Sequence, residues 1–448
     1  MTTRLLNNCL SFPKVSLKRL NNIKSYINLA TEMKLLNDKK QFEKALAIFD
    51  QHGINNITTL SNFAITQVLK ACAHLRDLKR GKIIHNLIAP KTKNDIYVSS
   101  TLIHMYMHCG DIASAQSLLD STKTKTPSMY GIMMKGYIKN KQANKAIDLF
   151  NEIENPDDVN MILLFNACAQ LKTKETLDLV KKTSKQIPKS FYSNPHLLTS
   201  LLDALMKCGD VAHAELLFYS SKEKVLPMYG AMMKGYIQNN LPDKAINVFN
   251  EVESPDEVNI NLLFNACAQL KTKEALNLVK KVSKEIPKSF YSNPHLLTSL
   301  LDALMKCGDV AHAESLFYSS KEKVLPMYGA MMKGYVENNL AQKTIELFNE
   351  LKNPADVNKT LLNQMKLDDI QSSIPIYLSA IKAVSQIGDY SKAQSIFKQI
   401  PDSLLVENQI RSALIDLWGK VGSVVEAKLI FDKIRQPNII EYTTMGLF

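Results

Sequence analysis

Two short strings in the chain have the residue types of a zinc centre. His213 and Glu215 are separated by one alanine, and His312 and Glu314 repeat this spacing 99 residues later. In zinc enzymes that deaminate nucleobases, the histidine of such an H-x-E string binds the metal and the glutamate transfers the proton. That chemistry also needs a downstream P-C-x-x-C, and the sequence contains no C-x-x-C. A Walker loop, G-x-S-x-G and H-E-x-x-H are absent as well, so we expect no metal, no cofactor and no enzyme.

The two strings recur because the chain contains a long internal repeat. Residues 129–227 and 228–326 align without a gap, and SNPHLLTSLLDALMKCGDVAHAE occupies both 193–215 and 292–314. A third copy begins at Met327 and then diverges. A period of 99 residues is too long for one supersecondary unit, so each period must contain several smaller repeats.

Each period contains three helix pairs, predicted at 228–252, 257–286 and 295–320. Apolar residues recur at i, i+3, i+4 and i+7, which is typical of an amphipathic helix. Alternating strand patterns and Asn-Gly hairpins do not occur. The prediction is an all-α fold, a right-handed superhelical solenoid. One buried stripe is predicted from Leu297, Leu300, Leu301 and Leu304.

The turn inside the third pair has residues suited to end one helix and begin the next. Gly308 is suited to a left-handed conformation, and Asp309 is placed to cap the second helix. Ala311, Ala313 and Phe317 are predicted to pack this helix against the first one.

The same register divides the chain into about twelve helix-turn-helix units. A basic segment is predicted at 1–25, an irregular insert at 356–373, and a continued array with a partial repeat at 374–448. The array at 26–355 divides into units 26–61, 62–95, 96–126, 127–157, 158–194, 195–225, 226–256, 257–293, 294–324 and 325–355.

Composition restricts the class of partner. The net charge is +12 and the isoelectric point is near 9.1, which favours an anionic partner such as nucleic acid. No run of 18 or more uncharged apolar residues occurs, so no membrane segment is expected. The cysteines recur at the repeat spacing without C-x-x-C pairs, which favours small packing residues of a reduced protein.

The first 31 residues are rich in Lys, Arg, Leu and Ser and contain no acidic residue. This composition is typical of a mitochondrial transit peptide, although a basic first helix of the array would look the same.

The stretches AITQVLKACAHLRDLKRGKIIHNLI (64–88) and DIYVSSTLIHMYMHCGDIASAQSLLD (95–120) resemble pentatricopeptide repeats. So does the stretch 408–445. The unequal unit lengths resemble the plant-type PLS subclass, in which long, short and standard motifs alternate. The tetratricopeptide repeat, also a helix pair, keeps a fixed period and a small residue where its helices cross, and fits less well.

The resemblance implies binding of single-stranded RNA at roughly one base per repeat. A polar residue near the start of the first helix and another at the end of the unit would read the base edge. An apolar residue three positions before the first would contact the base face. The candidates are Thr66 with Asp95, backed by Phe63 (implying G); Ser100 with Thr126 (ambiguous); Asn261 with Asn293, backed by Val258 (implying a pyrimidine); and Ser412 with Asn438 (implying A).

Other units depart from this pattern. The first position is glycine at 131, 230 and 329, and it is apolar at Ile162 and Leu378. Thr199 and Thr298 are paired with valines, which cannot form hydrogen bonds. We therefore expect weak or short-motif specificity. A competing interpretation is that the polar residues only cap helices.

These features predict an RNA-binding adaptor for organellar RNA processing or editing that presents a transcript to a separate enzyme. A monomer in the mitochondrion or another organelle is expected, with the cytoplasm as the alternative. Many plant-type members carry a C-terminal DYW deaminase, and we expect none in this chain. The alternative function is a protein-binding helical scaffold that has lost sequence-specific RNA recognition.

Overall fold

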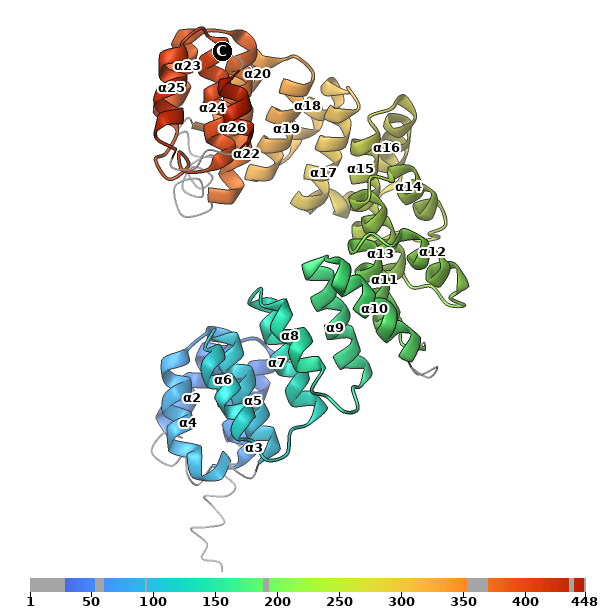
Figure 1. Ribbon diagram of the computed structural model, residues 1–448, viewed down its shortest axis with the longest axis vertical. Helices are drawn as coiled ribbons and strands as arrows, with labels where there is room; N and C mark the ends of the chain where they lie inside the picture. The colour runs from blue at the N-terminus through green and yellow to red at the C-terminus, as the bar shows by residue number, and fades with distance from the viewer. Residues whose placement is uncertain are drawn as a thin grey trace, which may run out of the picture. The chain divides into compact units, whose positions relative to one another are not determined.

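Helices make up the ordered backbone of this protein, as the computed structural model shows for residues 29–52, 60–92, 95–187, 193–352, 370–434 and 439–446 (Figure 1). Within these ranges there is no β-strand. The chain divides into two compact units, Met1–Leu217 and Phe218–Phe448, which are described separately. The basic segment predicted at 1–25, most of the insert predicted at 356–373, and Asn438 lie outside the described residues.

In the first unit, the helices alternate between first and second members of successive pairs. The first helices contact one another in the order α3, α5, α7, α9, α11, and each also contacts its own second helix. After a helical segment at 29–38, the helices are α2 (Phe42–His52), α3 (Asn62–Leu75), α4 (Leu78–Thr92), α5 (Ile96–His108), α6 (Ile112–Ser121), α7 (Pro127–Lys139), α8 (Ala143–Phe150), α9 (Asp158–Leu171), α10 (Lys174–Gln186) and α11 (Pro195–Lys207), followed by α12 (Val211–Ser220), which crosses into the second unit.

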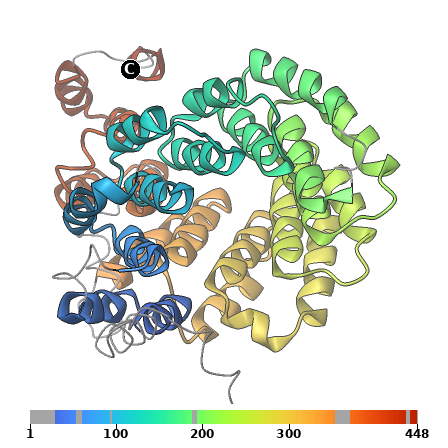
Figure 2. The same ribbon diagram turned by 90° about the horizontal axis from the view of Figure 1, so that it is seen from below.

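The second unit repeats this arrangement (Figure 2). Its first helices contact one another in the order α13, α15, α17, α19, α22, α24, α26. The helices are α13 (Leu226–Gln238), α14 (Pro242–Asn250), α15 (Glu257–Leu270), α16 (Lys273–Glu285), η3 (Lys288–Ser292), α17 (Pro294–Lys306), α18 (Val310–Ser319), α19 (Leu325–Glu337), α20 (Ala341–Lys352), α22 (Ile370–Ile387), α23 (Tyr390–Gln399), α24 (Asn408–Lys420), α25 (Val424–Asp432) and α26 (Ile439–Met445). Stacked helix pairs of this kind confirm the predicted all-α solenoid of helical repeats.

The core lies along the first helices, because each is covered by its neighbours and by its own partner. The predicted stripe of α17 is buried at all four leucines, with Leu301 and Leu304 fully inaccessible. Gly308 has a φ of +86°, as expected for a left-handed turn, and the Asp309 side chain accepts from His312 N at 3.2 Å. The prediction of this turn is therefore confirmed.

One packing prediction in the same pair is wrong. Ala313 and Phe317 are fully buried, whereas Ala311 is exposed. Residues four apart share a helix face, but a residue two positions away points to a different side. Ala311 therefore faces outward while Ala313 and Phe317 face the core.

Helix α22 begins at Ile370, inside the segment 356–373 that the sequence predicted to be irregular. Pro375 is the sixth residue of this helix and lies inside it. Because proline has no N–H, the helix lacks one backbone hydrogen bond at this position. Among the helices that the structure describes, none is long and apolar enough to cross a membrane.

Candidate nucleic-acid interface

The apolar residues predicted to contact base faces lie on the surface. Phe63, in the first turn of α3, is 48% exposed, and Val258, in the first turn of α15, is 60% exposed. Large apolar side chains at the start of a helix usually fold back onto the core. Exposed side chains at this register leave a face open for stacking.

Two further residues at this register were missed by the sequence reasoning. Tyr97 in α5 is 80% exposed and Val159 in α9 is 52% exposed. Tyr97 lies three residues before Ser100, as Phe63 lies three before Thr66. The three-residue spacing was therefore the signal that could have identified Tyr97.

The polar residues at the first position use their hydroxyl protons within their own helices. Thr66 Oγ1 donates to Phe63 O at 2.8 Å, and Ser100 Oγ donates to Ile96 O at 2.7 Å. A hydroxyl that donates to the backbone still has lone pairs that accept from a second donor. In this arrangement both side chains can therefore accept a hydrogen bond from a base N–H.

The residues at the second position cap the next first helix. Asp95 accepts from Val98 N at 2.9 Å, Thr126 from Met129 N at 3.3 Å, and Asn293 from His295 N at 3.0 Å. Capping, the competing interpretation of these residues, is therefore a role that all three perform. Each capping bond gives a partner to one backbone N–H of the first helical turn, which would otherwise be unsatisfied.

These caps also bring the two predicted positions of a pair to the same end of the repeat. Asn62 Nδ2 donates to the second carboxylate oxygen of Asp95, and Asn62 lies one turn before Thr66 in α3. Asn293 Nδ2 donates to Glu257, which lies one turn before Asn261 in α15. The two members of each pair are thus neighbours across adjacent first helices.

Asn261 differs from the other candidates because its side chain has an unused acceptor. Its Oδ1 is buried and has no hydrogen-bond partner among the residues that the structure describes. A buried acceptor is rarely left unsatisfied, so a water or a base donor would be favourable there. Ser412 is half-buried in α24, and its predicted partner Asn438 is not described.

A basic row continues along the same helix face in the first unit. Lys70, His104 and Lys135 each lie four residues after the first position of their repeats, on α3, α5 and α7. Residues at i, i+3 and i+7 share a helix face, so Phe63, Thr66 and Lys70 form one line.

A second basic row lies one turn further along, at His74, His108 and Lys139. The ring centroids of His104 and His108 are 4.3 Å apart, and those of His74 and His108 are 6.0 Å apart. Burial and the neighbouring charges of the two rows, including Lys135, lower the pKa of His104 to about 4. Burial and the charge of Lys139 also lower the pKa of His108. Depressed histidine pKa values are the effect expected of a locally positive surface.

The H-x-E string has a structural use. Glu314 accepts from Tyr335 OH at 2.8 Å and pairs with Lys343, which ties α18 to the following helix pair. Although burial opposes the shift, the hydrogen bonds from Lys343 and Tyr335 lower the pKa of Glu314. No group of three His, Cys, Asp or Glu side chains that could hold a metal occurs within the described ranges.

The cysteines that the structure describes are free thiols. Burial raises the pKa values of Cys72, Cys168 and Cys267 to about 12, so these thiols stay protonated and unreactive. The predicted role as small packing residues is confirmed for these three.

Comparison with known proteins identifies the repeat. A family model described as PPR repeat matches residues 128–155, 197–224, 227–254, 296–323 and 326–353. These five stretches of the chain match the PPR repeat model. Each matched stretch lies inside one predicted unit, and the longer units 158–194 and 257–293 are not matched.

Curated relatives are pentatricopeptide repeat-containing proteins of Arabidopsis thaliana. A chloroplastic one is 24% identical over 414 residues, covering 90% of this chain and 49% of the relative. A mitochondrial one is 25% identical over 421 residues, covering 91% of this chain and 58% of the relative. The chain thus spans about half the length of the curated relatives it matches.

Two of the solved structures with a similar arrangement are of one pentatricopeptide repeat protein. The crystal structure of PPR10 from maize is 15% identical, with a TM-score of 0.43, covering 98% of this chain and 68% of that one. A structure of PPR10 in complex with an 18-nt psaJ RNA element is 14% identical, with a TM-score of 0.41, covering 94% of this chain and 66% of that one.

Proposed function

We propose that this chain binds single-stranded RNA along the first helices of its pentatricopeptide repeats. One observation carries the proposal: an exposed apolar side chain and a polar side chain follow one another down the same face of α3 and of α5. In α3 they are Phe63 and Thr66, followed one turn later by the positive charge of Lys70. In α5 they are Tyr97 and Ser100, followed one turn later by His104, whose lowered pKa leaves the ring neutral at pH 7.

This order of side chains matches the chemistry of an unpaired nucleotide. A base stacks on an exposed apolar or aromatic face, and a neighbouring hydroxyl meets its hydrogen-bonding edge. Lysine side chains one turn further attract the phosphates, with release of counterions. Bases that are paired in a duplex offer neither a free face nor a free edge, so single strands are the preferred ligand.

Sequence preference depends on which side chains at the two positions can still accept or donate a hydrogen bond. Asp95 accepts from Asn62 and from Val98 N, and its carboxylate oxygens have further lone pairs for a base N–H. Gly131, Gly230 and Gly329 offer no side chain at all. We therefore propose weak specificity, concentrated at Thr66/Asp95, Ser100/Thr126, Asn261/Asn293 and Ser412/Asn438.

The finer assignment is a plant-type PLS protein that acts as a monomeric adaptor in organellar RNA processing or editing. The names of the relatives, mitochondrial in one case and chloroplastic in another, support an organelle. In this proposal the basic segment 1–25 directs import, and a separate enzyme acts on the bound transcript. Fusing residues 1–40 to a reporter tests the import step, which a purely cytosolic reporter would refute.

The experiment for RNA binding is an anisotropy titration with labelled single-stranded and duplex RNA at several salt concentrations. Tyr97→Ala should weaken single-strand binding about five- to hundredfold, since stacking contributes ~1–3 kcal/mol per base. The matched control is Leu216→Ala, which removes a 71% exposed apolar side chain from a second helix and should have no effect.

Duplex binding as tight as single-strand binding, or no binding below about 100 μM, would refute the RNA proposal. That outcome would favour the alternative of a protein-binding scaffold, which the internal caps at Asp95 and Asn293 also suit.

A further inference from the structure

An aromatic residue recurs at one register near the end of several first helices, three residues before the helix C-cap. In the units that carry tyrosine there, the hydroxyl reaches the preceding second helix. Tyr137 donates to Gln116 at 2.7 Å, and Tyr335 donates to Glu314 at 2.8 Å. At these positions the polar atom of the aromatic side chain is satisfied within the array.

Trp418 occupies this register in α24, and its polar atom is not satisfied. The Trp418 side chain is buried, at 2% exposure, and Nε1 has no hydrogen-bond partner among the described residues. The residue of α23 that corresponds to Glu314 is Gln394, five positions after the capping aspartate in both helices. The Gln394 Nε2 group donates to Tyr390 OH at 3.1 Å, and its amide oxygen does not accept from the indole. Since an indole N–H can only donate, it needs an acceptor from elsewhere.

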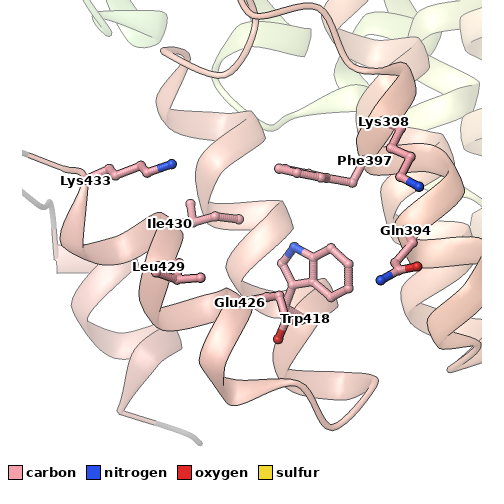
Figure 3. A pocket seen from close by; sticks show the side chains of 8 residues that line it. All are labelled: Gln394, Phe397, Lys398, Trp418, Glu426, Leu429, Ile430 and Lys433. Atoms are coloured by element: carbon pink, nitrogen blue, oxygen red, sulfur yellow. The ribbon is translucent and has the colours of Figure 1, made fainter.

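The indole borders a pocket of about 270 Å³ between α23, α24 and α25 (Figure 3). Phe397 from α23 and Ile430 and Leu429 from α25 form its apolar walls. In Figure 3 the nitrogen edge of Trp418 faces the space between Phe397 and Ile430. The volume is at the lower end for small-molecule sites and suits an inserted side chain.

The rim of this pocket is positively charged. Lys398 and Lys433 line it, and neither has an acidic partner in the part of the chain that the structure describes. Glu426 also lines the pocket, but its carboxylate accepts from Ser423 Oγ and from Tyr390 OH. Leu429, which lines the pocket, is 56% exposed, and Val425, one turn earlier in α25, is 70% exposed.

We propose that this pocket binds an acidic peptide segment of a partner protein. An apolar side chain of the peptide fills the space between Phe397 and Ile430, and a carbonyl or carboxylate oxygen accepts from Trp418 Nε1. Acidic residues beside that side chain pair with Lys398 and Lys433. The walls come mainly from second helices, whereas the proposed RNA contacts start at the first turns of first helices, so the two sites are independent.

Trp418 is the only tryptophan of the chain, so its fluorescence reports this pocket directly. The probe is an array of acidic peptides with one central Leu, Ile, Phe or Met, titrated into the full chain. A matched array has glutamine in place of every acidic residue. The acidic array should contain peptides that change the Trp418 emission saturably, and their matched neutral versions should bind at least tenfold more weakly.

Variants then separate a docking site from a general charge effect. With a labelled peptide, Lys398→Glu combined with Lys433→Glu should weaken binding at least tenfold. Trp418→Phe, which keeps a ring but loses the donor, should weaken it about two- to tenfold. Lys428→Glu, an exposed charge change on α25 outside the pocket, is the control and should leave affinity unchanged. Each variant should keep the parent melting temperature and its affinity for single-stranded RNA.

Three results would overturn the proposal. These are no binding by any peptide of the array at about 1 mM, an equal loss of affinity in the Lys428→Glu control, and a change of Trp418 emission caused by single-stranded RNA instead of peptide. Neither of the first two results affects the RNA proposal, because RNA binding is measured with the same protein in a separate titration.

Discussion

Two glycines of α19 should respond in opposite ways to substitution by alanine. Gly329 and Gly334 lie five residues apart in the same helix. A Cβ at Gly334 would lie 2.7 Å from both Cγ and Cε of Met305 and even closer to its Cβ. At Gly329 the nearest atom would be Pro375 Cβ at 3.8 Å, an ordinary contact. The glycine at 334 therefore allows close packing of α19 on α17, while the glycine at 329 does not.

The magnitudes follow from two opposing effects. Replacing glycine by alanine inside a helix contributes about 1 kcal/mol through backbone propensity. Overpacking a buried contact costs about 1–3 kcal/mol, and the clash with Met305 Cβ cannot be relieved by side-chain rotation. Gly334→Ala should therefore lower the free energy of unfolding by up to ~2 kcal/mol, whereas Gly329→Ala should raise it by up to ~1 kcal/mol.

Urea denaturation followed by circular dichroism measures both variants against the parent protein. Gly136→Ala in α7 is a second instance, because its Cβ would lie 2.8 Å from Met107 Cβ and 2.9 Å from Met107 Cγ. A Gly334→Ala variant as stable as Gly329→Ala would refute the reasoning, since it would mean that α17 and α19 can separate without cost.

Three further predictions concern pH, specificity and a buried hydrogen bond. Burial and neighbouring charges hold the pKa of His104 at about 4, so the folded state favours the neutral ring. The contribution of this ring to the free energy of unfolding should be fully present above about pH 6.5, the pKa in the unfolded chain. As the pH falls towards 4, the free energy of unfolding should decrease by ~2 kcal/mol, after allowance for partial exposure. In urea titrations His104→Gln should lose that part of the pH dependence, and an unchanged pH profile would contradict the prediction. Gly230→Thr would place a hydroxyl opposite Asp256, as Thr66 lies opposite Asp95, with only ordinary contacts around its Cβ. In a selection from random RNA the variant should enrich G at one additional position, with a preference over the other bases of ~1–3 kcal/mol. An unaltered base profile would count against the assigned positions. Tyr335→Phe should destabilise the protein by about 1 kcal/mol in urea, because Glu314 loses a hydrogen bond but keeps Lys343, and a neutral result would show that the bond contributes nothing.

The fold was predictable because its determinants are local. The turn at Gly308 and the cap at Asp309 depend on backbone conformation and on one nearby side chain, both of which residue type indicates directly. The error at Ala311 arose because small residues are compatible with either face of a helix. Tyr97 was missed although its spacing from Ser100 was visible, since the three-residue rule was applied only to Thr66 and Asn261.

The parts of the site that depend on several helices could not be predicted in this way. The bond from Asn62 to Asp95 joins residues 33 positions apart. Nothing in their local sequence distinguishes an aspartate that only caps a helix from one that also accepts a hydrogen bond from the preceding first helix. The unpaired donor of Trp418 is a still more distant property. It means that no acceptor of the neighbouring helices reaches Nε1, which depends on the packing of three helices.

The two near-identical periods show which side chains build the scaffold and which are free to vary. Lys181 pairs with Asp210 at 2.6 Å in one period, and Lys280 pairs with Asp309 at 2.6 Å in the other. The position of Ile162 in α9 is taken by Asn261 in α15, yet both helices have the same length and equivalent caps. Asn261 Oδ1 forms no bond among the described residues, so the scaffold does not depend on it. Replacing the residue at such a position breaks no hydrogen bond of the scaffold, which is the property that a variable base-contacting position needs.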